Sequence, residues 1–239
     1  DMMKITMLCT SGNQDALARG RCLPVARALA KMGHEVHALL LNSSFDQLSS
    51  AGRRYMDDGV EVHQVAQMHV YGPPGDRRHF GMKDLLRVTL QACGALYRQT
   101  VRLSPDVIHV CKPQPTNSLA GLFAARQMGC RLFLDCDDYE AQANRFTSPW
   151  QTWVVRWCED QMPRHVNGIT VNTRFLEHRC RKLMRPQAPL AYVPNGVSAA
   201  QRIPPGQSQI DASRARHGLG RNTVAYVGTM STIAHSVDL

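Results

Sequence analysis

The feature of this sequence that most constrains its fold is a repeated change from helical to strand-like patterning at a glycine. The change occurs at Gly33, Gly59, Gly129 and Gly168, and an apolar run follows each glycine at once. A glycine after a helix can adopt the left-handed conformation that closes the last turn. Helices that alternate with short buried strands predict a parallel sheet with helices on both faces.

The predicted fold class is α/β, a Rossmann-like doubly wound parallel sheet of about seven strands, followed by a truncated second Rossmann-like domain. Strands are expected near residues 4–9, 35–41, 60–65, 106–111, 131–136, 168–172 and 190–193. Helices are expected near residues 20–32, 45–57, 82–103, 116–128, 148–164 and 173–184. The helix over 82–103 is expected to bury a stripe of Leu86, Leu90, Cys93 and Tyr97. Residues 70–81 are expected to form a surface loop.

The C-terminal part of the chain changes character. Residues 198–220 are polar and contain Pro204-Pro205-Gly206, which is typical of an interdomain linker, with a short helix around 211–217. A new apolar strand is expected at 223–228, and one strand cannot bury both of its faces alone. We therefore predict an N-terminal domain over 1–197, a linker over 198–221 and the start of an incomplete second domain over 222–239. Docking of that strand on the first sheet is the alternative.

Composition limits the partners and the compartment. The eight cysteines contain no Cys-x-x-Cys pair, which favours a reduced, cytoplasmic protein without a disulfide scaffold or a zinc site. No apolar run approaches the ~20 residues that span a bilayer. The net charge of +9 permits contact with an anionic membrane surface or a phosphorylated ligand. Because the basic residues are not interleaved with aromatic ones, a nucleic acid partner is not expected.

Candidate site residues follow the strands, because open parallel sheets bind ligands beyond the carboxyl ends of their strands. Helix N-termini also meet at that edge and favour anions. Gly12 follows the first predicted strand, but a single glycine at such a position usually serves only to form the turn. The G-x-G-x-x-G fingerprint of a dinucleotide-binding site is not present. The residues predicted to bind substrate are Gly12, Asn13, Lys112, Asp135, Thr173, Arg174, Asn195 and Gly196.

The densest polar group at a strand end is Asp135-Cys136-Asp137-Asp138. Carboxylates this close repel one another, so at least one needs a proton, a cation or a basic partner such as Lys112 or Arg174. Asp137 and Asp138 are therefore the predicted catalytic residues, as a general base, an electrostatic stabiliser or groups that orient a hydroxyl. A helix cap by either residue is the structural alternative. A site for Mg²⁺ or Mn²⁺ on Asp135 and Asp137 is another, since oxygen ligands suit both ions.

Six phrases in a fixed order resemble the GT-B glycosyltransferases, in particular the retaining enzymes of family 4. The opening KITMLCTSG and VARALAKMGHEV look like that family's first strand, loop and helix. PDVIHV is similar to its fourth strand, and ITVNTRFLEHRCRKL to its sixth strand and the next helix. AYVPNGV resembles its Pro-Asn-Gly signature before the linker, and VAYVGTM the first strand of its nucleotide-sugar domain.

The resemblance implies a sugar transfer from a nucleotide-sugar donor to a sugar or lipid-linked acceptor, without a metal or other cofactor. The N-terminal domain would mainly bind the acceptor, and the missing second domain the donor. Two departures stand out: the family's histidine after the fifth strand is replaced by the run Asp135–Asp138, and its Gly-Gly pair by Ser11-Gly12-Asn13. We expect the chain alone to be inactive. Two other functions remain open: a non-catalytic module that binds a phosphorylated ligand or a protein, and a metal-dependent transferase.

Overall fold

The structure is a computed structural model that describes residues 1–15, 17–73, 76–144, 146, 148–196, 203–220 and 222–224. The chain divides into two compact units, Asp1–Asn195 and Gly196–Leu239. In the second unit one helix, α8, spans Gln207–His217 within the predicted linker. Most of the strand predicted at 223–228 lies outside the described residues.

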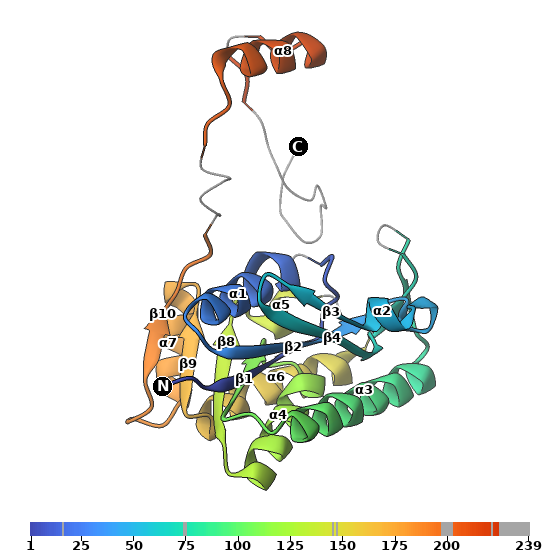
Figure 1. The fold of residues 1–239 in the computed structure, drawn as a ribbon, viewed down its shortest axis with the longest axis vertical. Helices are drawn as coiled ribbons and strands as arrows, with labels where there is room; N and C mark the ends of the chain where they lie inside the picture. Colours follow the sequence, from blue (N-terminus) through green and yellow to red (C-terminus); the bar gives the residue numbers. More distant parts are fainter. Residues whose placement is uncertain are drawn as a thin grey trace. The chain divides into compact units, whose positions relative to one another are not determined.

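The first unit is built on a mostly parallel sheet (Figure 1). Its strands are β1 (Lys4–Cys9), β2 (Glu35–Asn42), β3 (Arg54–Asp57), β4 (Val60–Gln67), β7 (Val107–Cys111), β8 (Arg131–Cys136), β9 (Gly168–Val171) and β10 (Leu190–Tyr192). They lie in the order β10-β9-β8-β7-β1-β2-β4-β3, and only β3 is antiparallel. From β1 the chain first adds β2, β4 and β3 on one side of the sheet, and then β7, β8, β9 and β10 on the other side. The direction in which strands are added therefore reverses between β1 and β7. This is the doubly wound Rossmann-like topology that was predicted.

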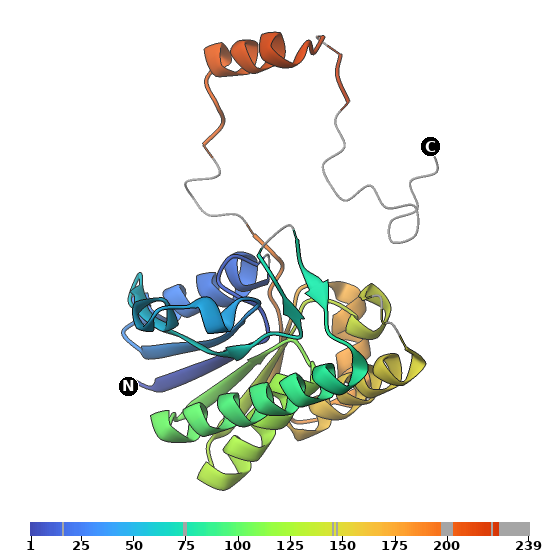
Figure 2. The ribbon, with the colours of Figure 1, turned by 90° about the vertical axis from the view of Figure 1, so that its right-hand side faces the viewer.

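Helices cover both faces of the sheet (Figure 2). Alternate residues of β1 separate the two cores: Leu8 belongs to one and Met7 to the other. The core around Met7 packs against α1 (Leu23–Lys31), which follows one π-helical turn at Ala18–Cys22. The core around Leu8 packs against α3 (Met82–Leu103), α4 (Pro115–Met128), α6 (Pro149–His165) and α7 (Arg174–Leu183). Helix α5 (Glu140–Ala143) and helix α2 (Ser50–Arg53) are single turns. No described helix has both the length and the apolarity needed to cross a bilayer.

The four glycines of the repeating pattern play different roles. Gly33 and Gly129 have φ values of +90° and +67° and end α1 and α4, as predicted. Gly59 does not follow a helix: with Asp58 it forms the turn between β3 and β4. Gly168 is the first residue of β9, and a Cβ atom there would lie 2.8 Å from the ring of Phe133. This last glycine is therefore required by a close side-chain approach and not by a left-handed turn.

Two other predictions were wrong. The helix expected over 45–57 is a 3₁₀ turn at Phe45–Gln47, then α2, then the edge strand β3. This strand makes an eighth member of the sheet. The expected loop over 70–81 contains a short ribbon of β5 (Val70–Tyr71) and β6 (Arg78–His79).

The buried face of α3 also differs from the prediction. Leu86 and Leu90 are 55% and 63% exposed, whereas Ala92 and Leu96 lie in the core. Of the predicted stripe, Cys93 and Tyr97 do pack against this core as partly buried side chains, whereas Leu86 and Leu90 do not. The buried face of α3 is shifted to Val88, Ala92, Leu96 and Thr100, because the contact with α4 and the sheet decides which face turns inward.

Candidate functional site

A cleft lies where the strand order reverses, beyond the carboxyl ends of β1 and β7. Its volume is about 410 Å³, and its walls come from the segments after these strands and from the β5–β6 ribbon. The lining residues are Thr10, Ser11, Asp15, Leu17, Met68, His69, Val70, Arg77, His79, Lys112, Gln114, Glu140 and Asn144. In doubly wound sheets this position is the usual ligand site. A second hollow of about 450 Å³ on α6 receives no strand end, and Arg156 is the one ionisable group among the described residues that line it.

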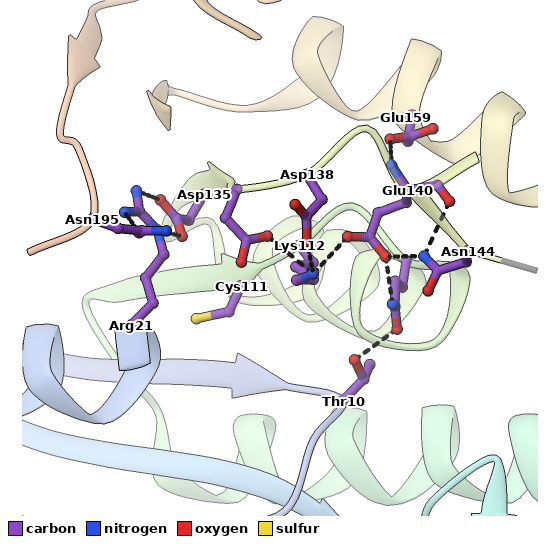
Figure 3. A network of polar contacts seen from close by, with 12 residues as sticks. Thr10, Arg21, Cys111, Lys112, Asp135, Asp138, Glu140, Asn144, Glu159 and Asn195 are labelled. Atoms are coloured by element: carbon purple, nitrogen blue, oxygen red, sulfur yellow. Dashed lines mark hydrogen bonds and ion pairs between the residues drawn. The ribbon is translucent and has the colours of Figure 1, made fainter. Parts of the chain in front are cut away.

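Lys112, the first residue after β7, is the centre of the polar groups in this cleft (Figure 3). Its Nζ atom lies 2.7 Å from Asp138 Oδ2, 2.8 Å from Glu140 Oε1 and 3.3 Å from Asp137 Oδ1. Its backbone has a φ of +70°, which few non-glycine residues adopt. We call Lys112, Asp137, Asp138 and Glu140 the Lys112 cluster. One cation against three carboxylates leaves this cluster with a surplus of negative charge when all are ionised.

The titration of the Lys112 cluster reflects that surplus. Burial alone would lower the pKa of Lys112, but the charges of Glu140 and Asp137 outweigh it and the pKa is raised. Burial raises the pKa of Asp137 to about 6; Lys112 opposes the rise, while Asp138 and Glu140 add to it. The Asp137 side chain is 11% exposed, and its Oδ1 atom has the 3.3 Å contact with the Lys112 ammonium but no shorter hydrogen bond among the described residues. Asp137 thus combines a weakly held oxygen with a proton affinity suited to exchange near neutral pH.

Glu140 fixes the position of this cluster. It is 1% exposed, and its Oε2 atom accepts hydrogen bonds from Gln114 (2.8 Å) and Asn144 (2.9 Å) (Figure 3). Gln114 in turn accepts a hydrogen bond of 2.7 Å from the hydroxyl of Thr10. Glu159 of α6 accepts the backbone N–H groups of Glu140 and Ala141 at 2.6 and 3.0 Å. The chain of bonds ties the ends of β1 and β7 to α5 and α6.

A second network lies beside the first, and its charges balance. The guanidinium of Arg21 donates to both oxygens of Asp135, at 2.5 and 2.6 Å, and the two residues are 7% and 3% exposed. Thr170 of β9 also donates to Asp135. Arg21 further donates to the carbonyl of Val193 and, at 2.9 Å, to Oδ1 of Asn195. We call Arg21, Asp135, Thr170 and Asn195 the Arg21 network, and Figure 3 shows three of its members, Arg21, Asp135 and Asn195.

The Arg21 network changes the interpretation of two predicted ligand-binding residues. The carboxylate of Asp135 is occupied by Arg21 and Thr170 and is shielded from solvent. The amide oxygen of Asn195 accepts from Arg21. Both side chains therefore hold the end of β8 and the segment after β10 together, and the oxygens that accept from Arg21 are engaged within the protein.

The remaining predicted residues are spread around the same edge of the sheet. The N–H of Gly12 donates to Oδ2 of Asp15 at 2.7 Å, so a carboxylate of the chain already takes the position of an anionic ligand. Asn13 lies beside the hydroxyl of Tyr55. Burial raises the pKa of this hydroxyl above its ordinary value, and the hydrogen bond with the Asn13 side chain offsets only part of the rise.

Three predicted residues lie further from the cleft. Thr173 caps α7 by accepting the N–H of Leu176 at 3.2 Å. Arg174 pairs with Glu177 and covers the ring of Tyr192 at 4.1 Å. Gly196 is exposed, with no atom near its missing Cβ. Of the predicted residues, all of which the structure describes, Lys112 alone belongs to the cleft lining, and Asp137 and Asp138 contact its Nζ atom from outside that lining. The predicted residues Gly12, Asn13, Asp135, Thr173, Arg174 and Asn195 do not line the cleft.

Sequence reasoning missed Arg21, Gln114 and Glu140. Arg21 lies in a helical turn, where a basic residue is normally taken for a surface group. Glu140 follows the Asp run by two positions, so its place on the α5 turn brings it back to Lys112. The one available signal was local: a fourth acid so close to the Asp run demands a cation.

The sheet, its reversal point and the cleft lined by Lys112 and Glu140 define an α/β domain of the Rossmann type. The family model described as a glycosyl transferase 4-like domain matches residues 19–196. The chain belongs to this family, and the resemblance to GT-B glycosyltransferases is confirmed.

Solved structures agree on the fold. Sucrose-phosphate synthase from Thermosynechococcus elongatus matches with a TM-score of 0.63 and 11% identity, over 91% of this chain and 53% of that protein. A glycosyltransferase from Rickettsia africae matches with a TM-score of 0.53 and 8% identity, over 93% and 51%. HepE from Anabaena, in complex with UDP-glucose, matches with a TM-score of 0.54 and 14% identity, over 90% and 50%. This chain therefore spans about half the length of these proteins. No curated protein sequence matches it.

Proposed function

We propose that this chain is the acceptor-side part of a glycosyltransferase that moves a sugar from a nucleotide-sugar donor to a sugar or lipid-linked acceptor. Family membership supports the reaction class. The observation that carries the proposal is the cleft at the reversal point of the sheet, which Lys112 and Glu140 line. The ammonium of Lys112 also contacts Asp137 and Asp138 beside this cleft. Sugar hydroxyls are good donors to carboxylates, and a cleft of about 410 Å³ accommodates a ligand of that size.

Beside Lys112 at the edge of the cleft, Asp137 would accept the reacting hydroxyl of the acceptor, and Asp138 a neighbouring hydroxyl. With a pKa of about 6, Asp137 is mostly ionised at pH 7 and still holds a proton well enough to receive one during transfer. Lys112 would keep the carboxylates fixed, and Glu140 would keep Lys112 fixed. The surplus negative charge disfavours a phosphate beside these residues, so the donor diphosphate would be held elsewhere, mainly by a second domain.

We further propose that the chemistry is retaining and independent of a metal. The ammonium of Lys112 takes the central position among Asp137, Asp138 and Glu140 that a divalent ion would need. Asp135 is bound by Arg21, which leaves Asp135 and Asp137 unsuited to share a metal. Retention of configuration rests on likeness to the family alone.

The proposal is tested by calorimetric titration of the chain with a panel of neutral mono- and disaccharides and their lipid-linked forms. We expect one saturable site, weakened at least tenfold in both Asp137→Asn and Asp138→Asn. Asp84→Asn is the matched control, because Asp84 is an exposed carboxylate on α3 paired with Arg87. If the Asp137 and Asp138 variants bind as the control does, the assignment of the site is wrong.

By itself the chain should not transfer sugar, since the donor would be bound mainly by the second domain. Incubation of the purified chain with nucleotide sugars and the acceptors that bind should yield no glycosylated product by mass spectrometry. A longer polypeptide, in which this chain continues past Leu239 into a second α/β domain, should carry out the transfer. Robust turnover by the chain alone would refute this part of the proposal.

A cytoplasmic location with peripheral membrane contact is the remaining proposal. The basic helix α7 would supply the contact, although Arg174 and Arg181 both pair with Glu177 and Arg179 pairs with Asp160. These pairs reduce the charge that is free to meet anionic lipids. Binding to vesicles with anionic lipid should exceed binding to neutral vesicles; equal binding would exclude an electrostatic contact.

A further inference from the structure

Two neighbouring strands carry the same tripeptide, Glu-Val-His, near their amino ends. In β2 it is Glu35-Val36-His37, and in β4 it is Glu61-Val62-His63. Residues two apart in a strand share a face of the sheet. In the parallel register His37 lies opposite Glu61, and His63 follows Glu61 on the same face. The two strands therefore gather two imidazoles and a carboxylate at the opposite end of the sheet from the cleft.

The three side chains present three ligand atoms to one another. His37 Nδ1 lies 3.3 Å from His63 Nε2 and 3.1 Å from Glu61 Oε2, and the third edge, between His63 Nε2 and Glu61 Oε2, is 3.7 Å. His37 and His63 are 5% and 6% exposed. When Nε2 of His37 carries the proton that Glu35 accepts, Nδ1 has none, so Nδ1 and Glu61 Oε2 face each other as two acceptors at 3.1 Å. The triangle is thus incompletely satisfied by hydrogen bonds alone.

The size of this triangle fits a tetrahedral ion. Zn²⁺ bonds nitrogen and oxygen at roughly 2.0–2.2 Å, so two ligand atoms of a tetrahedral site lie about 3.3–3.5 Å apart. An octahedral site with bonds of the same length would bring adjacent ligand atoms to about 3.0 Å. The observed edges of 3.1, 3.3 and 3.7 Å bracket the tetrahedral value.

Outer partners hold these ligands in orientation. His37 Nε2 contacts Glu35 Oε1 at 2.9 Å, and Glu35 is held by Lys4 at 3.0 Å. The other oxygen of Glu61 pairs with Arg54. A carboxylate on the far nitrogen of a metal-binding histidine fixes its tautomer and makes it a stronger ligand. The Glu35–His37 contact is that arrangement.

We propose that His37, Glu61 and His63 form a site for one Zn²⁺ ion, with a water molecule as fourth ligand. Two imidazoles and one carboxylate are a common ligand set for zinc with one open position. The ion would link β2 to β4 and lies apart from the cleft, so the proposal is independent of the proposed function. The acidic group in the cleft carries no such proposal, because Lys112 is already placed among its carboxylates.

The test uses the purified chain, stripped with a chelator and titrated with Zn²⁺ by calorimetry, with metal content measured by mass spectrometry. We expect one Zn²⁺ per chain, and a rise in the melting temperature on binding. His37→Asn and His63→Asn should each weaken binding at least 100-fold. His178→Asn, at an exposed position of α7, is the matched control and should bind as the parent does.

Two further measurements keep the proposal decidable. Co²⁺ in this site should show the intense visible absorption of a tetrahedral ion without the thiolate charge-transfer band that ligation by the free cysteines would add. Glu35→Gln keeps all three ligands, changes an exposed side chain and should weaken binding about tenfold, even if the histidine variants fail to fold. A thiolate band, unchanged affinity in Glu35→Gln, or no bound zinc in the parent would each overturn the assignment.

Discussion

The Arg21 network and the Lys112 cluster stand side by side at the same edge of the sheet, yet they are built differently. In the first, one guanidinium meets one buried carboxylate, and hydroxyl and amide groups complete the bonding. In the second, one ammonium meets three carboxylates, and its contact with Asp137 Oδ1, at 3.3 Å, is the longest of the three. A balanced network stabilises the fold, whereas an unbalanced one retains groups that a ligand can use. The comparison predicts that stability depends on the first and binding on the second.

The largest expected effect is on stability, from Arg21→Met. It leaves the buried carboxylate of Asp135 without its cation and should cost about 3–5 kcal/mol in the free energy of unfolding. Urea denaturation at pH 7 measures this loss. The double variant Arg21→Met with Asp135→Leu should lose much less than the two single variants together, because no buried charge remains. Additive losses would show that the two residues do not act as a pair.

Lys112→Met should cost about 3 kcal/mol at pH 8, where all three carboxylates are ionised around the missing cation. The loss should shrink towards pH 5, because without Lys112 the carboxylates take up protons more readily. Sugar binding should also be lost, which distinguishes this variant from Arg21→Met. Melting temperatures across this pH range, with calorimetric titration, give both readouts. A loss that does not depend on pH would remove the distinction between the two regions.

Asp137→Asn should stabilise the protein at neutral pH. The folded pKa of about 6 lies above the ordinary value of 3.8, so the folded state holds the proton more tightly than the unfolded state. The parent therefore loses stability as the pH rises from about 4 to about 6, and the variant should not. At pH 8 the gain should be about 2–3 kcal/mol, and near pH 4 it should vanish.

Acceptor binding should show the opposite trend in the parent. The ionised form of Asp137 is the one that accepts the hydroxyl, so affinity should increase as the pH rises through about 6. In Asp137→Asn that step should be absent. An acceptor affinity that falls over the same pH range would contradict the role given to Asp137.

The smallest expected effects come from a matched pair of hydroxyl deletions. Thr170→Val removes a hydrogen bond to the charged Asp135, and should cost about 2 kcal/mol. Thr10→Val removes a hydrogen bond to the neutral amide of Gln114, and should cost about 1 kcal/mol. Both substitutions keep the side-chain shape. Equal losses by urea denaturation would indicate that the two networks contribute alike to the fold.

Much of the fold could be predicted because it is encoded locally. Apolar runs placed seven strands close to their observed bounds, and the glycines at 33 and 129 marked two helix ends correctly. The edge strand β3 could not be predicted in this way. Its residues suit a helix nearly as well, and pairing with β4 decides their conformation. The buried face of α3 was likewise decided by its neighbour α4.

The candidate site likewise has one part that the local sequence predicts and another part that it does not. The sequence by itself determined the parallel sheet, the edge at which polar groups gather, and the presence of Lys112, Asp137 and Asp138 there, because strand and helix periodicities are local properties of the chain. Only the tertiary structure decided that Arg21 occupies Asp135, that Glu140 returns to Lys112, and that two Glu-Val-His tripeptides meet. Charges and ligand atoms act through distance and burial, and both depend on which distant segments the fold brings into contact.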